Sequence, residues 1–260
     1  MDITAQTALV TGASTGIGAA FARELAARGA NLILVARSED KLRDLAAQLE
    51  ARHPIKAGVI AADLQQPGSA DALARRVADL GHAVDILVNS AGFATHGLVT
   101  EADPARLTAQ MQLNNVTLVE LTQRMLPGMI DRHRGIIVNV ASTAAYQPLP
   151  HMAVYSATKA FVLTFTEALW AEARPAGVKV IAISPGATQT PFFDVVGADE
   201  ASIGRRRSPE QVVATTWRGL ERGRPSVIDG GANVLLAQAP RVSPRRVVIQ
   251  MAERTMRPRR

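Results

Sequence analysis

The chain has 260 residues and 47% of them are hydrophobic, which suits one large α/β domain with a substantial buried core. It contains no cysteine, which excludes a disulfide framework, a thiolate zinc site and a cysteine nucleophile. The net charge of +6 lies in residues 241–260, where seven arginines accompany one glutamate, so the rest of the chain is balanced. We therefore expect no basic groove for nucleic acid.

The two ends of the chain differ in character. The N-terminal residues MDITAQTALVTG begin with an acidic residue at position 2 and contain no long apolar stretch, so no secretory signal is expected. No apolar run approaches the roughly 20 residues that span a bilayer, and we expect a cytoplasmic protein without a membrane span. The basic tail, residues 241–260, is expected to be a solvated helix or a frayed end. Contact with acidic lipid, a partner surface or nucleic acid is the alternative.

Short apolar runs alternate with helical patterns along most of the chain. We expect strands at residues 7–11, 31–36, 55–62, 84–89, 135–142, 178–184 and 225–229. Helices are expected at residues 17–28, 40–52, 69–80, 104–131, 153–174 and 209–222. The strands are continuously apolar, which is typical of a parallel sheet covered on both faces. The pattern predicts a doubly wound α/β fold of the Rossmann type, an α/β/α sandwich that forms one domain over residues 1–260.

Residues 187–208 interrupt this alternation and are predicted to form a mobile loop over a ligand site. The loop ends at Ser208-Pro209-Glu210-Gln211, which has the pattern of a capping box at a helix start. In doubly wound sheets ligands bind outside the carboxyl ends of the strands, and the motifs described next follow those ends.

The first expected strand leads into the glycine-rich turn TGASTGIG, residues 11–18. Glycines let the backbone approach a pyrophosphate, and the helix that follows points free N–H groups at it. The expected cofactor contacts are Gly12, Ser14, Thr15, Gly16, Ile17 and Gly18. The alternative is a tight strand-to-helix turn that binds no ligand.

Arg37 follows the second expected strand, where an acidic residue would bind the ribose hydroxyls of NAD. A guanidinium at this place suits the 2′-phosphate of NADP instead. Asp63 and Leu64 follow the third strand, and Asp63 is a candidate acceptor for the adenine amino group. A solvated arginine and a simple turn aspartate are the alternatives.

Tyr155 and Lys159 lie four residues apart in an expected helix and therefore share one face. A phenol has a pKa of about 10, and a nearby ammonium favours the phenolate and lowers that pKa. Such a phenol can exchange a proton with a carbonyl oxygen while a hydride arrives. Ser142, at the end of the preceding strand, can hydrogen-bond the same oxygen.

Together with NSAG (89–92), YSATK (155–159) and PGATQT (185–190), these motifs resemble the short-chain dehydrogenase/reductase family. The resemblance covers residues 5 to 230, and LILVARSEDKL is similar to the NADP-preferring branch. It implies that Asn89 braces the central strands and that Asn115 holds a proton-relay water, although Asn114 is adjacent. It also implies that Lys159 binds the nicotinamide ribose. The remaining implied cofactor contacts are Ala91, Pro185, Gly186, Thr188 and Thr190.

The sequence therefore predicts an NADP(H)-dependent oxidoreductase that interconverts a ketone or aldehyde and an alcohol. The candidate substrate-lining residues, mostly apolar, are Phe93, His96, Tyr146, Leu149, His151, Met152, Phe192 and Phe193. His151 is expected to be a surface histidine rather than a substrate ligand. Scattered histidines predict no catalytic metal, and the absence of G-x-S-x-G argues against a serine hydrolase.

Two other functions remain open at this stage. One is a non-catalytic NADP(H)-binding sensor, and the other is an epimerase or dehydratase of the same fold. The family resemblance further implies a homodimer or homotetramer that pairs through residues 104–131 and 153–174.

Overall fold

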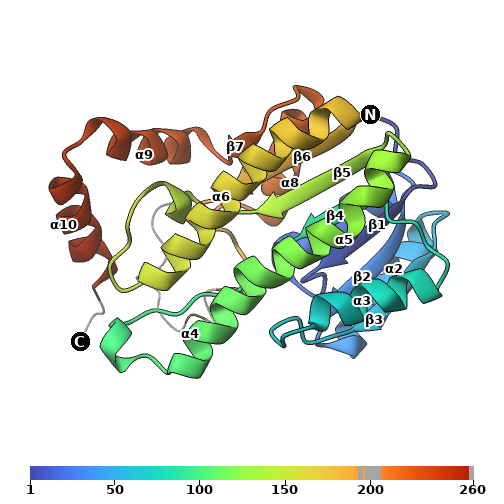
Figure 1. Cartoon of the computed structure of the whole chain (residues 1–260), viewed down its shortest axis with the longest axis horizontal. Coiled ribbons are helices and arrows are strands. Elements are labelled where there is room, and N and C mark those ends of the chain that lie inside the picture. Colours follow the sequence, from blue (N-terminus) through green and yellow to red (C-terminus); the bar gives the residue numbers. More distant parts are fainter. Residues whose placement is uncertain (193–195, 197–205, 258–260) are drawn as a thin grey trace.

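The computed structural model of the chain describes residues 1–192, 196 and 206–257 (Figure 1). Its centre is a parallel sheet in the order β3-β2-β1-β4-β5-β6-β7. The strands are β1 (Thr7–Thr11), β2 (Asn31–Ala36), β3 (Ala57–Ala61), β4 (Ile86–Asn89), β5 (Gly135–Val140), β6 (Val178–Ser184) and β7 (Ser226–Ile228). The strand order reverses between β1 and β4, and this confirms the predicted doubly wound fold.

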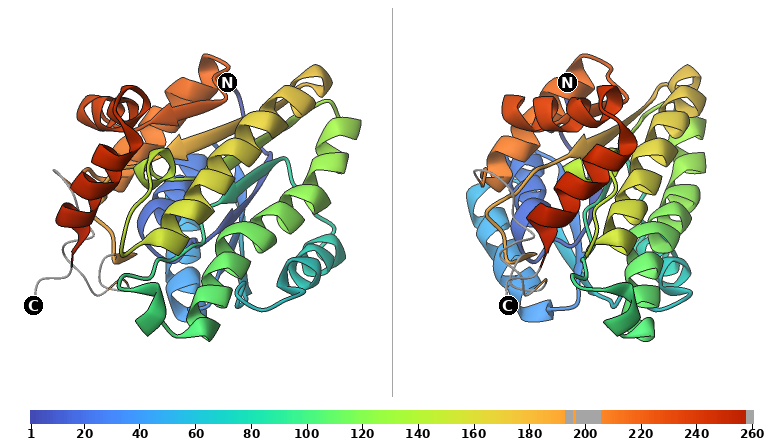
Figure 2. Two further views of the ribbon diagram at one scale, coloured as in Figure 1. Left: turned by 60° about the vertical axis from the view of Figure 1, so that its left-hand side comes forward. Right: turned by 90° about the vertical axis from the view of Figure 1, so that its left-hand side faces the viewer.

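Helices cover both faces of this sheet, as the continuously apolar strands require (Figures 1 and 2). One face packs against α1 (Gly16–Ala27), α2 (Glu39–Arg52) and α8 (Pro209–Glu221). The other packs against α3 (Ser69–Asp79), α5 (Thr117–Asp131) and α6 (Ala153–Ala173). The result is the predicted three-layer sandwich.

The helix expected over residues 104–131 is interrupted. It begins at α4 (Pro104–Met111), where Asp103 caps it by accepting a hydrogen bond from the Ala105 amide. A π-helical turn (Gln112–Val116) then separates α4 from α5. Single π turns inside α-helices are frequent at functional sites because they re-aim side chains. Asn114 and Asn115 both lie in this turn.

The chain does not end at β7. Two further helices follow, α9 (Gly231–Val242) and α10 (Arg245–Met256), and Figure 1 shows them at the side of the molecule that carries β7. Residues 245–256 form a helix, which was one of the two expectations for the tail, but the helix is solvated on one face only, because Val248, Ala252 and Met256 are buried. Within the described part of the chain, no helix is long and apolar enough to cross a membrane.

Candidate active site

A cavity of about 460 Å³ opens at the carboxyl ends of the strands. It begins at the loops after β1, β2 and β3 and runs past the ends of β5 and β6 to the C-terminal helices. Most of the predicted site residues line it: Gly12, Ser14, Thr15, Gly16, Ile17, Gly18, Arg37, Asp63, Leu64, Ser142, Tyr155, Lys159, Pro185, Gly186, Thr188 and Thr190. Asn89, Ala91 and Asn115 do not line it.

The glycine-rich turn has the geometry of an anion cradle. Gly16 has a φ of +57°, and a Cβ there would lie 2.9 Å from the Thr190 side chain. A Cβ at Gly18 would overlap the carbonyl oxygen of Gly12. Thr15 precedes α1 without a side-chain cap, so the first amides of this helix are left for a ligand. These features fit the pyrophosphate of a dinucleotide.

Two polar side chains line the end of the cavity next to β2 and β3. Arg37 is exposed, and no hydrogen bond or ion pair is found for its guanidinium among the described residues. Asp63 accepts hydrogen bonds from the Gln65 amide and the Gln66 side chain, at 3.1 and 3.2 Å. Asp63 therefore shapes its turn and also lines the cavity, so the two sequence interpretations are compatible.

Asn89 and Ala91 lie outside the cavity lining and hold the elements next to it in place. The Asn89 side chain is buried and donates to Asn139 Oδ1 at 2.9 Å, which joins β4 to β5. Thr11 Oγ1 accepts from the amides of Ser90 and Ala91, at 3.0 and 3.1 Å, and so fixes this segment against the glycine turn. The structure thus places Asn89 where it can brace the central strands.

Ser142, Tyr155 and Lys159 come together at one wall of the cavity. All three are buried, and the Lys159 Nζ lies 5.9 Å from the centre of the Tyr155 ring. Lys159 donates to the carbonyl oxygen of Val140 at 2.7 Å, which anchors its chain to the end of β5. The Ser142 Oγ accepts from the Ala144 amide at 3.1 Å and so begins the short helix that follows.

Burial controls the titration of this group. It raises the pKa of Tyr155 to about 12, and a hydrogen bond with Ser142 opposes the rise. Burial also lowers the pKa of Lys159 to about 8, because the ammonium loses hydration. The net direction of the Tyr155 pKa is opposite to the lowering expected from Lys159, because desolvation outweighs the hydrogen bond with Ser142.

The two asparagines of the π turn have different surroundings. Asn114 is 1% exposed, accepts from the Phe93 amide, and donates to the Phe93 carbonyl and to Thr158. Asn115 is only half-buried and donates to the carbonyl oxygen of Thr158 at 2.9 Å. A Cβ built on Gly92 would lie within 4 Å of both Asn114 Oδ1 and Lys159 Nζ. Asn114 is therefore the asparagine that lies near Lys159.

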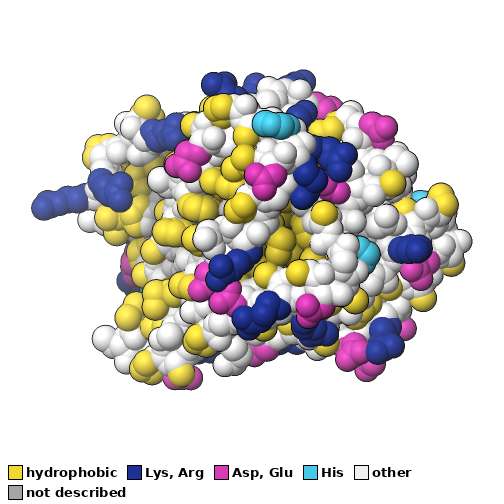
Figure 3. Space-filling model, turned by 45° about the vertical axis from the view of Figure 1, so that its right-hand side comes forward, with side chains coloured by type: hydrophobic (Ala, Val, Ile, Leu, Met, Phe, Trp, Pro, Cys, Tyr) yellow, Lys and Arg dark blue, Asp and Glu magenta, His cyan; other side chains and the backbone are white. Residues whose placement is uncertain are grey.

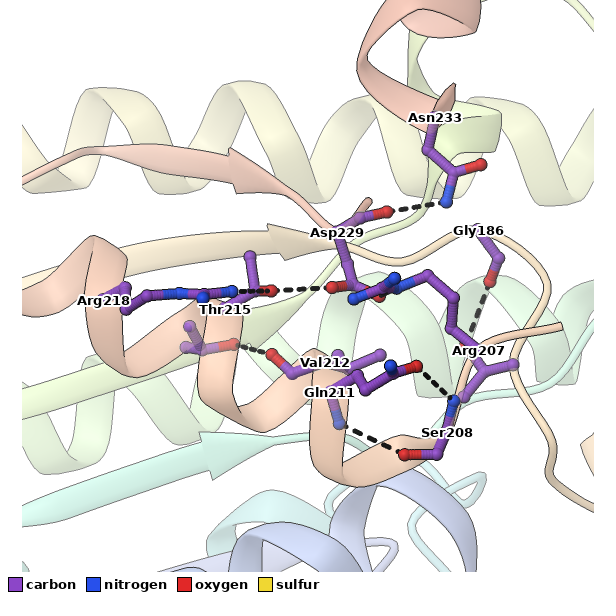
Figure 4. A network of polar contacts seen from close by, with 11 residues as sticks. Gly186, Arg207, Ser208, Gln211, Val212, Thr215, Arg218, Asp229 and Asn233 are labelled. Atoms are coloured by element: carbon purple, nitrogen blue, oxygen red, sulfur yellow. Dashed lines mark hydrogen bonds and ion pairs between the residues drawn. The ribbon is translucent and has the colours of Figure 1, made fainter. Parts of the chain in front are cut away.

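The segment that follows β6 is fixed by a polar network (Figure 4). Arg207 exchanges backbone hydrogen bonds with Ala187 and Gln189, each 2.9 Å long, which closes the base of the loop. Its guanidinium contacts the fully buried carboxylate of Asp229 at 2.6 Å. Asn233, on α9, donates to the Asp229 carbonyl at 2.6 Å and lies against Gly186. The predicted loop itself falls mostly on residues 193–195 and 197–205, outside the described residues.

The substrate-lining predictions divide into two groups. Phe93, Leu149, Met152 and Phe192 line the cavity, and the Phe192 ring lies 5.7 Å from that of Tyr155. The predictions for His96, Tyr146 and His151 are not supported, because these residues are absent from its lining. Phe193 lies outside the described residues.

His151 also differs from the expected surface histidine. Its side chain is only 10% exposed and lies 3.9 Å from Glu253 of α10. His96 Nε2 lies 2.8 Å from the Met256 carbonyl and donates to it, because a carbonyl only accepts. His96 therefore attaches α10 to the body of the protein, and His151 lies beside the same helix.

The end of the cavity next to Tyr155 includes lining residues that the sequence analysis missed. Asn233, Leu236 and Ala237 of α9 and Met256 of α10 line it. Met256 is 2% exposed and packs in one cluster with Tyr155 and Leu149. The apolar spacing of Val248, Ala252 and Met256, four residues apart, was the available signal for a packed helix.

Comparison with known protein families gives a consistent result. The family model described as short chain dehydrogenase matches residues 6–201. An uncharacterized oxidoreductase of Staphylococcus epidermidis is 37% identical over 78% of this chain and 84% of its own length. A very-long-chain 3-oxoacyl-CoA reductase of Phaeosphaeria nodorum is 38% identical over 90% of this chain and 67% of its own. The mouse (Mus musculus) 17-beta-hydroxysteroid dehydrogenase type 3 is 35% identical over 72% of this chain and 61% of its own length.

Solved structures show the same likeness. A short-chain dehydrogenase from Sphingobium yanoikuyae in complex with NADPH superimposes with a TM-score of 0.82 at 31% identity, over 91% of this chain and 93% of that one. A 7beta-hydroxysteroid dehydrogenase gives a TM-score of 0.87 at 26% identity, over 97% of this chain and 99% of that one.

Proposed function

Because this chain belongs to the short-chain dehydrogenase family, we propose that it is an NADP(H)-dependent oxidoreductase that interconverts a carbonyl compound and an alcohol. The observation that carries the proposal is the meeting of Ser142, Tyr155 and Lys159 in the cavity that the glycine turn opens. A bound nicotinamide would supply or accept the hydride. The protein side chains then have only to orient the substrate and move one proton.

Tyr155 is the proposed proton donor in the reduction. With a pKa of about 12 it is a protonated phenol at neutral pH, so it can give its proton to the substrate oxygen as the carbonyl carbon receives the hydride. The Ser142 hydroxyl would hydrogen-bond the same oxygen and stabilise its developing negative charge. In the oxidation, the same groups would take the proton back from the alcohol.

Lys159 is proposed to have two roles. Its ammonium stabilises the phenolate that remains after proton transfer, and its Nζ would also bind the nicotinamide ribose. We propose that Asn114, and not Asn115, holds the water through which Tyr155 is reprotonated. The closeness of Asn114 to Lys159 supports this choice.

The preference for NADP(H) rests on Arg37. An exposed guanidinium at the end of β2, where the lining residues are Ala36, Arg37 and Ser38 and none is acidic, suits a 2′-phosphate and does not suit the paired hydroxyls of NAD. The NADPH complex of the similar Sphingobium yanoikuyae protein supports the same cofactor. Asp63 and Leu64 would hold the adenine end of this cofactor, and residues 185–190 would hold its nicotinamide end.

The proposed substrate is a ketone on a bulky apolar skeleton, of the size of a steroid or a long acyl chain. Phe93, Leu149, Met152, Phe192, Leu236 and Met256 give that part of the cavity apolar walls. The names of two relatives, a very-long-chain 3-oxoacyl-CoA reductase and a hydroxysteroid dehydrogenase, support the same class.

The test is NADPH oxidation by the purified protein with a panel of steroid ketones, 3-oxoacyl thioesters and small aldehydes. Turnover that disappears in Tyr155→Phe, and persists in the control Tyr146→Phe, would establish the mechanism. Tyr146 is the other tyrosine of the chain and lies outside the cavity lining. Arg37→Asp should shift the preference from NADPH to NADH. Tight NADPH binding without turnover of any substrate would favour the sensor function instead.

The assembly proposed for this enzyme is a dimer or tetramer in the cytoplasm, built on α4–α5 and α6. Two apolar side chains on these elements are exposed: Val116, in the turn between α4 and α5, is 43% exposed, and Phe161, on α6, is 46% exposed. The face of the protein that carries α5 and α6 shows a band of hydrophobic side chains (Figure 3). Sedimentation analysis of the wild type and of Phe161→Glu would test the pairing.

A further inference from the structure

The last two helices carry an unusual share of the exposed hydrophobic side chains among the described residues. Val242 is 89% exposed, Leu235 74% and Met251 64%, which are the three highest values among the exposed large hydrophobic residues. Val247 adds a fourth at 45%. Contiguous exposed apolar surface marks a site of contact with a protein, a membrane or a ligand.

Arginines surround this apolar surface. Arg241, Arg245 and Arg246 are exposed and flank Val242 and Val247 where α9 passes into α10. The residues before position 241 carry no net charge, so the excess of the whole chain lies in residues 241–260, to which Arg241, Arg245 and Arg246 belong. On the left of Figure 3, where α9 and α10 lie, hydrophobic and basic side chains occur next to each other.

The two helices each have an inner and an outer face. α10 buries Val248, Ala252 and Met256 and turns Val247 and Met251 outward, four residues apart. α9 buries Ala237 and exposes Leu235 and Val242. Figures 1 and 2 show the corner between the helices at the edge of the molecule, away from the sheet. We define the α9–α10 surface as Leu235, Val242, Val247, Met251, Arg245 and Arg246.

We propose that the α9–α10 surface docks the protein on an anionic lipid bilayer. Apolar side chains next to arginines are the combination that enters the headgroup region, where the apolar groups leave water and the arginines meet lipid phosphates. Neither helix is long enough to span a bilayer, so the contact is interfacial. A second copy fits the surface less well, because pairing this surface with itself would bring together two patches that both carry Arg245 and Arg246 and so have the same sign of charge.

The docking surface also borders the cavity. Behind this surface, the same two helices line the cavity through Leu236 and Ala237 of α9 and Met256 of α10. A protein docked through these helices would hold the substrate end of the cavity beside the bilayer, from which an apolar ketone can enter without crossing water. This consequence rests on the proposed function, whereas the docking itself does not.

The experiment is co-sedimentation of the full chain with vesicles, without cofactor or substrate. We expect binding to vesicles of phosphatidylcholine and phosphatidylglycerol in equal parts, weak binding to pure phosphatidylcholine, and release by high salt. Arg245→Gln/Arg246→Gln should weaken binding by at least tenfold, because each arginine near an anionic surface contributes a factor of about five. Val242→Ser/Met251→Ser should weaken it as well.

The matched control is Arg52→Gln/Arg75→Gln, which removes the same charge from exposed positions on α2 and α3 and should bind like the wild type. Equal losses in this control and in Arg245→Gln/Arg246→Gln would overturn the proposal, as would binding that does not depend on phosphatidylglycerol. Dissociation of a dimer by Val242→Ser/Met251→Ser would instead identify the surface as a self-association interface. Circular dichroism verifies that each variant is folded, and none of these readouts depends on catalysis.

Discussion

Lys159 is a cation held inside the protein, 6% exposed, and its pKa of about 8 lies below the ordinary value of 10.5. The folded chain therefore binds this proton less tightly than the unfolded chain does. The resulting penalty on folding is fully present below pH 8, and it is relieved as the pH rises from about 8 toward 10.5. A group needed for catalysis is thus expected to lower stability at neutral pH.

Lys159→Met should be inactive. Its free energy of unfolding should exceed that of the wild type by more at pH 7 than at pH 10. The difference between variant and wild type should shrink by about 3 kcal/mol between these two pH values, because the shift spans at least two units. Urea unfolding at pH 7 and pH 10 measures it. The control Lys179→Met removes an exposed lysine and should show no such change. A difference that is constant with pH would contradict the buried ammonium.

The two asparagines of the π turn offer a second residue-scale test. Asn114→Ala removes three hydrogen bonds around Phe93 and Thr158, and as the proposed relay residue it should lower kcat by about a hundredfold or more. Asn115→Ala removes one bond to the Thr158 carbonyl, so it should cost about 1 kcal/mol of stability and leave kcat nearly unchanged. Steady-state kinetics and thermal unfolding of both variants separate the roles. Loss of kcat in Asn115→Ala alone would restore the sequence prediction.

At the scale of elements, Asp229 connects the loop after β6 to α8 and α9. It accepts from Arg207 at 2.6 Å and from Thr215 at 2.7 Å. Asp229→Asn keeps the shape of the side chain but leaves the half-buried Arg207 guanidinium without its charge partner. We therefore expect the free energy of unfolding to fall by roughly 2 kcal/mol. This is less than the loss for a fully buried ion pair, because Arg207 is partly exposed.

The same variant should raise the KM for NADPH, because Ala187 and Thr188 are held through Arg207. Thermal unfolding and kinetics of Asp229→Asn measure the two effects. The control Asp44→Asn changes an exposed carboxylate on α2 and should alter neither quantity. A loss of stability with an unchanged KM would mean that the network supports the fold but not the cofactor loop.

The regular elements were predictable because each buried strand is a continuous apolar run and each helix has a recognisable start. Ser208 and Gln211, for example, form the expected capping box. The π turn was not predictable, since one residue inserted into a hydrogen-bond ladder displaces the apolar spacing by a single position, within the irregularity of ordinary helix patterns. Asn114 and Asn115 could not be ranked for the same reason. Their rank depends on which side chain the turn directs toward Lys159.

At the scale of the whole molecule, one cavity joins the beginning of the chain to its end. The glycine turn after β1 lines the proposed cofactor end, and α9 and α10 line the proposed substrate end. Charge dominates the sequence of the tail and conceals the apolar spacing of Val248, Ala252 and Met256. Among the residues that line the cavity, the sequence therefore predicted more of those at the proposed cofactor end than of those at the proposed substrate end, because phosphate binding requires particular residues whereas an apolar wall accepts many.

Met256 tests whether α10 is part of that wall. Met256→Ala shortens a side chain that is 2% exposed beside Tyr155, so the KM for a bulky apolar ketone should rise about tenfold, the effect of one or two lost methylene contacts. The Kd for NADPH should stay unchanged, because the phosphate and adenosine contacts lie at the other end of the cavity. Met251→Ala, on the outer face of the same helix, is the matched control and should behave as the wild type with a dissolved substrate. If both variants bind the ketone normally, α10 covers the cavity without contacting what it holds. The apolar substrate class would then rest on Phe93, Leu149, Met152 and Phe192 alone.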